Sequence, residues 1–157
     1  MSPADTRIRH CLDACRQNNR TALVSFITAG DPGPSYTVAA LHSLVAGGVD
    51  ILELGIPFSD PEAEGPSIQA ANERALAHGV TLANVLQMVE EFRLKDATTP
   101  VVLMGYLNSV LAMEDFAERA GGAGVDGLIM VNLPPEEGDQ LQRKLAANNI
   151  DLIYLLA

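Results

Sequence analysis

The chain has 157 residues, enough for one globular domain with its own core, and 48% of them are hydrophobic. Aromatic residues make up only 4%, so the core has to be built from aliphatic side chains. The net charge of −10 argues against proteins that bind nucleic acid or anionic membranes, because both need a basic surface. The negative charge does not exclude a phosphate ligand, since backbone N–H groups at a helix N-terminus can bind one.

Two cysteines, Cys11 and Cys15, lie four residues apart near the N-terminus, with His10 beside them. On a helix they would share one face. A zinc site needs about four ligands, and the sequence has no second Cys/His pair, so we expect reduced thiols and no metal. Reduced thiols, the lack of a signal peptide and the lack of an apolar run of about 20 residues predict a soluble, cytoplasmic protein.

The first predicted element is a strand over residues 22–30, an apolar and β-branched run that ends in a turn. Helical spacing then predicts a helix over 35–48, with Ser35 as its N-cap and the glycines at 47–48 as its end. Residues 49–56 form a second apolar run, which predicts a buried strand.

The region 67–96 is predicted to be helical in two pieces, the first ending at Gly79 and the second capped by Thr81. A third strand is predicted over 100–108, followed by a short helix over 113–124.

A fourth strand is predicted over 125–134, then a helix that starts at Pro135, then a fifth strand over 150–157. The alternation of apolar strands and helices is typical of parallel β/α proteins with both sheet faces covered. Five such strands can form an open doubly wound sheet or belong to an eight-stranded barrel, which needs about 250 residues. Because the chain ends on its fifth strand, we expect a single, C-terminally incomplete domain over 1–157.

The most informative stretch is "VDILELGIPFSDPEAEGPSIQ", which starts at Val49. Glu53 is the fifth residue of the predicted strand, and its neighbours Leu52 and Leu54 point to the opposite face. Active sites of parallel β/α proteins lie at the carboxyl ends of the strands. Burial there raises the pKa of a carboxyl group and suits it to acid–base catalysis near neutral pH. The alternative is a Glu without a catalytic role, which is paired with a neighbouring donor or turned toward solvent on an outer face.

Glu64 lies in the loop that follows the same strand and could share a ligand with Glu53, although loop acids are usually only solvated. Asp60 and Glu62 are weaker candidates in the same loop. Phe26 from the first predicted strand and Met104, Tyr106 and Asn108 from the third offer an apolar wall with one phenol, which suits a flat, partly aromatic ligand. Ordinary core packing is the alternative for Phe26 and for Met104.

The segments "FITAGDPG", "ILELGIPFSDPEAEGPSIQAANERAL", "PVVLMGYLN", "GVDGLIMVNLP" and "IDLIYLLA" together resemble the alpha subunit of tryptophan synthase, over about residues 22–157. The resemblance implies an α/β fold, a parallel (β/α) barrel of TIM type, with only about the first five βα units present. It implies a lyase that cleaves indole-3-glycerol phosphate to indole and glyceraldehyde 3-phosphate, with no metal or organic cofactor in this subunit.

By the same resemblance, Glu53 is the general acid–base residue and Glu64 the second catalytic acid, which in much of the family is Asp. Four residues match positions that line the indole pocket: Phe26, Ile68, Met104 and Tyr106. Four others match the surface that faces the beta subunit: Pro57, Phe58, Ser59 and Asp60. That partner carries pyridoxal phosphate, and an alpha2-beta2 complex is expected.

The phosphate site of such barrels comes from loops after strands 7 and 8, so we predict little catalysis by the 157 residues alone. An alternative hypothesis is a non-catalytic partial barrel that only binds a partner. A Schiff-base aldolase on a β/α barrel is less well supported, because none of the five predicted strands contains a Lys.

Overall fold

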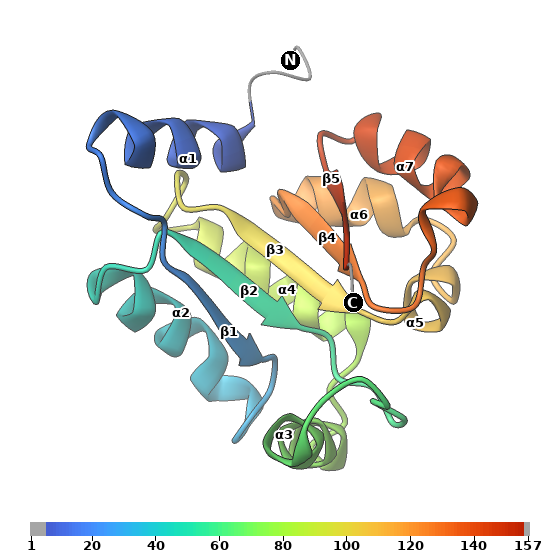
Figure 1. Cartoon of the computed structure of the whole chain (residues 1–157). Coiled ribbons are helices and arrows are strands. Elements are labelled where there is room, and N and C mark those ends of the chain that lie inside the picture. Colours follow the sequence, from blue (N-terminus) through green and yellow to red (C-terminus); the bar gives the residue numbers. More distant parts are fainter. Residues whose placement is uncertain (1–5, 156–157) are drawn as a thin grey trace.

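The computed structural model of the chain describes residues 6–155, and its centre is one sheet of five parallel strands in the order β1-β2-β3-β4-β5 (Figure 1). The strands are β1 (Val24–Thr28), β2 (Ile51–Gly55), β3 (Val101–Gly105), β4 (Gly127–Met130) and β5 (Asp151–Tyr154). The α-helices are α1 (Arg7–Gln17), α2 (Thr37–Ala46), α3 (Pro66–Ala77), α4 (Leu82–Arg93), α5 (Leu107–Leu111), α6 (Phe116–Ala123) and α7 (Asp139–Ala146). Sequential parallel pairing confirms the predicted class and all five predicted strands.

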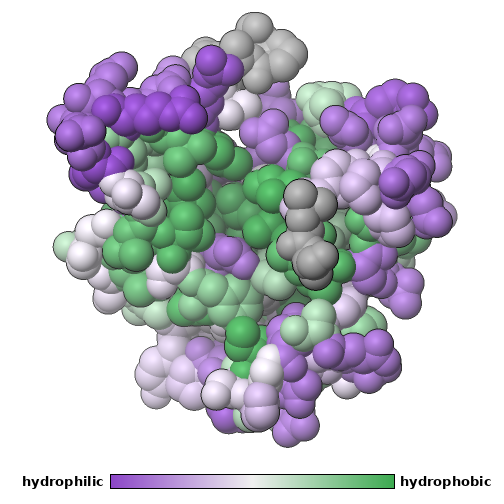
Figure 2. Space-filling model, viewed as in Figure 1, coloured by the Kyte–Doolittle hydropathy of each residue, from purple (hydrophilic) through white to green (hydrophobic). Residues whose placement is uncertain are grey.

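Helices cover one face of the sheet, where α2, α4 and α6 pack side by side (Figure 1). The strand residues on that face are fully buried, among them Leu52, Leu54, Leu103 and Leu128. The alternate residues, which point to the other face, are partly exposed over much of the sheet. Figure 2 shows this other face as a largely hydrophobic surface bordered by hydrophilic residues over α1 and α7. The sheet therefore has one filled face and one open apolar face, as an unclosed part of a barrel would.

Helix α1 lies at the amino ends of the strands and closes that end of the open face (Figure 1). Gly127 of β4 leaves the space for this contact: a Cβ there would lie 3.1 Å from Cδ1 of Ile8 and 3.2 Å from side-chain carbons of Val102 and Ile153. The open face is thus filled at its amino end and accessible toward its carboxyl end, where the sites of β/α proteins lie.

A buried carboxylate ties α1 and α4 to the start of the sheet. Asp126, 4% exposed, accepts hydrogen bonds from Arg7 Nη1 (2.8 Å), Arg93 Nη2 (2.7 Å) and the backbone N–H of Val101 (2.8 Å). Arg93 also donates to the carbonyl oxygens of Gly124 and of two residues in the α4–β3 loop. Each charged group is therefore paired, as buried charges have to be.

Several predicted helix ends are confirmed. Thr81 caps α4, and its hydroxyl accepts from the N–H of Asn84 at 3.3 Å while the Asn84 side chain accepts from the N–H of Thr81 at 2.9 Å. Gly47 is the C-cap of α2, and Gly48 follows with φ +98°, a conformation that glycine adopts without strain.

Several predicted boundaries are wrong, and at three of them a local turn replaces a longer regular element. Ser35 is not the N-cap of α2, since it lies inside a 3-10 turn, Pro34–Tyr36, that begins after Gly33. The helix predicted to start at Pro135 begins as a second 3-10 turn, Pro135–Glu137. The third strand stops at Gly105, because Asn132 accepts from the backbone N–H of Leu107 at 2.8 Å and the chain turns there into α5.

His42 provides a test of the packing between α2 and α4. Its ring lies 4.7 Å from the Phe92 ring, and its Nε2 atom is buried without a hydrogen-bond partner in residues 6–155. A buried polar atom without a partner costs about 1–3 kcal/mol. We therefore expect His42→Leu to raise the free energy of unfolding by about 1 kcal/mol, measured by urea denaturation.

The exposed His78 offers the control for this substitution. We expect His78→Leu to change stability by less than about 0.5 kcal/mol. A clear loss of stability in His42→Leu would show that the imidazole nitrogen has a partner, such as a bound water, that the apolar side chain removes.

Candidate active site

Glu53 lies on the open face of the sheet, in the middle of β2. It pairs in register with Phe26 of β1 and Val102 of β3, while Leu52 and Leu54 point to the helix-covered face. Its side chain is half-buried, and no hydrogen bond from another residue within 6–155 contributes to the pKa of its carboxyl group. Burial raises the pKa of the Glu53 carboxyl group above its ordinary value. Such a group holds a proton closer to neutral pH than a solvated carboxyl does, which acid–base catalysis requires.

Phe26 and Met104 lie on the same face as Glu53. The Phe26 ring lies against the backbone of Gly55, where an added Cβ would be 2.6 Å from its Cζ atom. Met104 pairs in register with Gly55 and is partly exposed. Together these side chains form an apolar surface beside the carboxyl group, and the missing side chain at position 55 is what leaves room for the Phe26 ring.

Glu64 lies in the loop between β2 and α3, and its carboxylate is held from the neighbouring strand. The Tyr106 hydroxyl, just after β3, donates to Glu64 Oε2 at 2.6 Å and accepts from the Ala63 N–H at 3.1 Å. Burial and the Glu64 carboxylate raise the pKa of Tyr106 to about 12, so the phenol stays protonated and donates at neutral pH. Gln69 of α3 donates to the Glu64 carbonyl oxygen at 2.8 Å.

The four residues predicted to face a partner differ in exposure. Pro57 is buried, Phe58 is partly buried, and Ser59 and Asp60 are exposed. The Phe58 ring stacks on Tyr106 with ring centroids 4.7 Å apart, and its N–H donates to Asn72 Oδ1 at 3.0 Å. Of these four residues, only Ser59 and Asp60 are therefore fully exposed for docking.

The predicted site residues thus form two groups. Phe26, Glu53 and Met104 share the open face of the sheet, and Glu64 and Tyr106 are joined by a hydrogen bond at the carboxyl end. No hydrogen bond or ion pair in residues 6–155 joins the two groups, so a ligand would have to bridge them.

The remaining residue predicted to line the pocket, Ile68, lies on α3 together with two amide side chains, Gln69 and Asn72. Ile68 lies in the first turn, is partly buried, and accepts from Asn72 Nδ2 through its carbonyl oxygen at 3.0 Å. Asn72, 5% exposed, and Gln69 both hold the β2–α3 loop. Sequence reasoning missed these two, because an amide in a helix that contacts a loop leaves no periodic signal.

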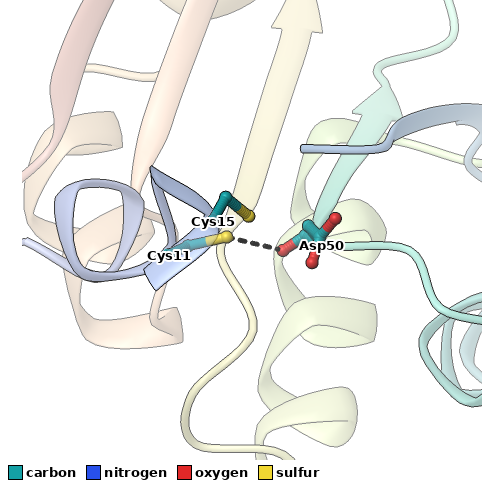
Figure 3. A group of neighbouring side chains, drawn as sticks. All are labelled: Cys11, Cys15 and Asp50. Atoms are coloured by element: carbon teal, nitrogen blue, oxygen red, sulfur yellow. Dashed lines mark hydrogen bonds between the residues drawn. The ribbon is translucent and has the colours of Figure 1, made fainter. Parts of the chain in front are cut away.

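The two cysteines are free, and their sulfurs point toward Asp50 at the amino end of β2 (Figure 3). Cys11 donates to the Asp50 carbonyl oxygen at 3.4 Å, and the two Sγ atoms and one Asp50 carboxylate oxygen lie within 4.8 Å of one another. The Asp50 carboxylate is already bonded to Arg20 through two nitrogens and to the N–H of Leu23. A metal ion there would have to compete with that guanidinium, so the expectation of two thiols without a metal stays a prediction.

None of the helices within residues 6–155 has the length and apolar character needed to cross a bilayer.

Comparisons with known proteins agree with this geometry. The family model described as tryptophan synthase alpha chain matches residues 12–157. Curated proteins of that name from Alkalilimnicola ehrlichii and Marinobacter nauticus are 56% and 54% identical over 96% and 97% of this chain. The crystal structure of tryptophan synthase subunit alpha from Legionella pneumophila has a TM-score of 0.94 at 51% identity over 98% of this chain. The chain spans only 56% and 57% of the two curated relatives and 59% of the crystallised chain.

Proposed function

Because this chain belongs to the tryptophan synthase alpha chain family, we propose that it supplies five β/α units of a barrel that cleaves indole-3-glycerol phosphate to indole and glyceraldehyde 3-phosphate. The observation that carries the proposal is the placement of Glu53. A half-buried carboxyl group with a raised pKa, on the open face beside the Phe26 ring, suits proton transfer to and from an aromatic substrate.

The proposed step is a retro-aldol cleavage. The Glu53 carboxyl group gives its proton to the indole ring carbon that carries the glycerol chain, and the carbon–carbon bond to that chain then breaks. The hydroxyl group on the adjacent glycerol carbon loses its proton to the Glu53 carboxylate and becomes the aldehyde. The catalyst returns to its starting state, because one proton leaves Glu53 and one comes back. Glu64 holds the indole N–H through its carboxylate, which polarises the ring while the charge develops.

Membership of this family also suggests which cofactors and partners accompany the reaction. We propose that no metal or organic cofactor acts in this chain and that a beta subunit, carrying pyridoxal phosphate, docks on the loop tip at Ser59 and Asp60. An alpha2-beta2 assembly is the arrangement we expect. The free thiols of Cys11 and Cys15 support a cytoplasmic location.

The proposal is tested by completing the barrel. Residues 1–157 are joined to the remaining C-terminal part of the alpha chain from Alkalilimnicola ehrlichii, which is 56% identical over the shared region. We expect this chimera to release indole from indole-3-glycerol phosphate. We expect the 157-residue chain alone to be slower by on the order of 10²-fold or more, since binding of the remote phosphate contributes to transition-state stabilisation.

The isolated C-terminal part of the relative is the control and should release no indole. A folded chimera with no activity would contradict the proposed function. Equal activity in the chimera and the 157-residue chain would contradict the expected need for the phosphate site.

A further inference from the structure

We infer that Tyr106 is a positioning residue, which fixes the Glu64 carboxylate and the surrounding loop, rather than only a surface against the indole ring. The inference rests on the proposed function for the role of Glu64, but the contacts that carry it do not. Tyr106 follows β3, whereas everything its side chain contacts through hydrogen bonds or ring stacking belongs to the β2–α3 loop.

One side chain fixes this loop at three points. The hydroxyl donates to the Glu64 carboxylate and accepts from the Ala63 N–H, and the ring stacks on Phe58 with an interplanar angle of 19°. Tyr106 itself is 7% exposed, so it belongs to the buried carboxyl end of the sheet rather than to the surface. A loop that carries three acidic residues and three prolines or glycines is thereby attached to β3, a strand that neither directly precedes nor directly follows it in the chain.

The hydrogen bond from Tyr106 leaves one oxygen of the Glu64 carboxylate available to a ligand. Tyr106 is the only side chain within residues 6–155 that donates to its carboxylate, and it uses Oε2. A carboxylate has two oxygens and about four acceptor positions. Oε1 therefore stays available to accept the N–H of a ligand while Oε2 is anchored. An unanchored Glu would have to give up its rotamer freedom on binding, so anchoring it in advance favours the reactive arrangement.

The hydroxyl of Tyr106 can be removed without removing its ring. In Tyr106→Phe the stack on Phe58 and the packing remain, while the Ala63 N–H loses its acceptor. We expect the Ala63 amide to exchange its hydrogen about five- to tenfold faster, the change that corresponds to one hydrogen bond. The matched control is Tyr36→Phe, because Tyr36 is 62% exposed, and it should leave that amide unchanged.

The bond to Glu64 is tested on the same 157-residue chain with 3-fluorotyrosine and fluorine NMR. We expect Glu64→Gln to shift the fluorine resonance of Tyr106 and to lower the pKa of its phenol, because the Glu64 carboxylate is one cause, after burial, of the raised pKa. Glu62→Gln, two residues earlier and exposed, is the control and should have little effect. If Tyr106→Phe leaves Ala63 exchange unchanged, or Glu64→Gln leaves the Tyr106 signal unchanged, the inference is wrong, whatever the activity of the chain.

The catalytic consequence is tested in the chimera. A positioning residue acts through Glu64, so its effect should disappear once Glu64 is gone. We expect Tyr106→Phe to lower kcat about tenfold with little change in KM, and the double variant Tyr106→Phe/Glu64→Gln to match Glu64→Gln alone. If the effects of the two substitutions instead multiply and fall mainly on KM, Tyr106 is only part of the surface that binds the substrate. A chimera inactive before any substitution would contradict the proposed function but would leave the NMR and exchange results to decide the inference.

Discussion

Replacing Glu53 with Gln in the completed barrel is expected to lower kcat for indole release by about 10²- to 10⁴-fold, the range that a general acid–base group contributes. Gln keeps the size and polarity of the side chain but cannot give up or accept the proton. Because no hydrogen bond within residues 6–155 contributes to the pKa of Glu53, the substitution removes no hydrogen bond and keeps the packing of the side chain. The loss should therefore fall on the chemical step and leave the fold intact.

Glu62→Gln is the matched control, since it makes the same change in the exposed loop beside the site and should keep nearly full activity. The pair of variants also separates an enzyme from a partner-binding module. In both hypotheses Glu53→Gln still binds a beta subunit, but only an enzyme loses indole release. Unchanged activity in a well-folded Glu53→Gln chimera would remove Glu53 from the mechanism.

The same substitution has an expected effect on stability that depends on pH. Burial raises the pKa of Glu53 in the folded chain above its value in the unfolded chain, so the folded state holds the proton more tightly. This contribution is fully present below the ordinary pKa of about 4.3 and is lost as the pH rises through the folded-state pKa. Glu53→Gln should match the parent chain near pH 4 and be slightly more stable near pH 7. Urea unfolding at both pH values measures the difference, and a variant that is less stable at pH 7 would contradict the sign.

The second large effect concerns the fold. Asp126→Ala should lower the free energy of unfolding by about 3–5 kcal/mol, the cost of removing one partner from a buried ion pair. Its carboxylate, 5% exposed, neutralises Arg93, whose side chain is 11% exposed, and also holds Arg7 and the Val101 N–H. Without it, the guanidinium of Arg93 loses its ion-pair partner and the buried Val101 N–H loses its acceptor, where α1, α4 and β3 meet.

Asp13→Ala is the control for this prediction. Asp13 pairs with Arg9 and Arg16 on the surface of α1 at 3.6 and 3.5 Å, with 44% of its side chain exposed. Exposed pairs of this kind contribute about 0–1 kcal/mol, so thermal unfolding should hardly change. Similar losses in Asp126→Ala and Asp13→Ala would show that the Asp126 network does not hold the amino ends of the strands together.

Much of this architecture follows from local sequence patterns. Short apolar runs separated by helical spacing predict the five parallel strands, because the periodicity of a buried strand depends on consecutive residues. The placement of Glu53 opposite Leu52 and Leu54 follows from the alternation of side chains along a strand, and the structure confirms it. The Thr81 cap is predictable for the same reason, since its partner Asn84 is only three residues away.

Contacts between distant residues could not be predicted in this way. Tyr106 and Glu64 are 42 residues apart, and Arg7 and Asp126 are 119 apart. The early end of β3 depends on Asn132, which reaches back 25 residues to the Leu107 N–H. Such pairs form only when the fold brings residues of separate β/α units to the same end of the sheet. A local sequence pattern does not predict them.

The sequence by itself therefore determined the β/α class, the five strands and the face on which Glu53 lies. Only the tertiary structure decided which groups hold Glu64, which charges neutralise Asp126 and how much of the β2–α3 loop is exposed. The physical reason is one of range: backbone periodicity and capping act over a few residues, whereas the burial and pairing of a polar side chain depend on whatever the fold places against it.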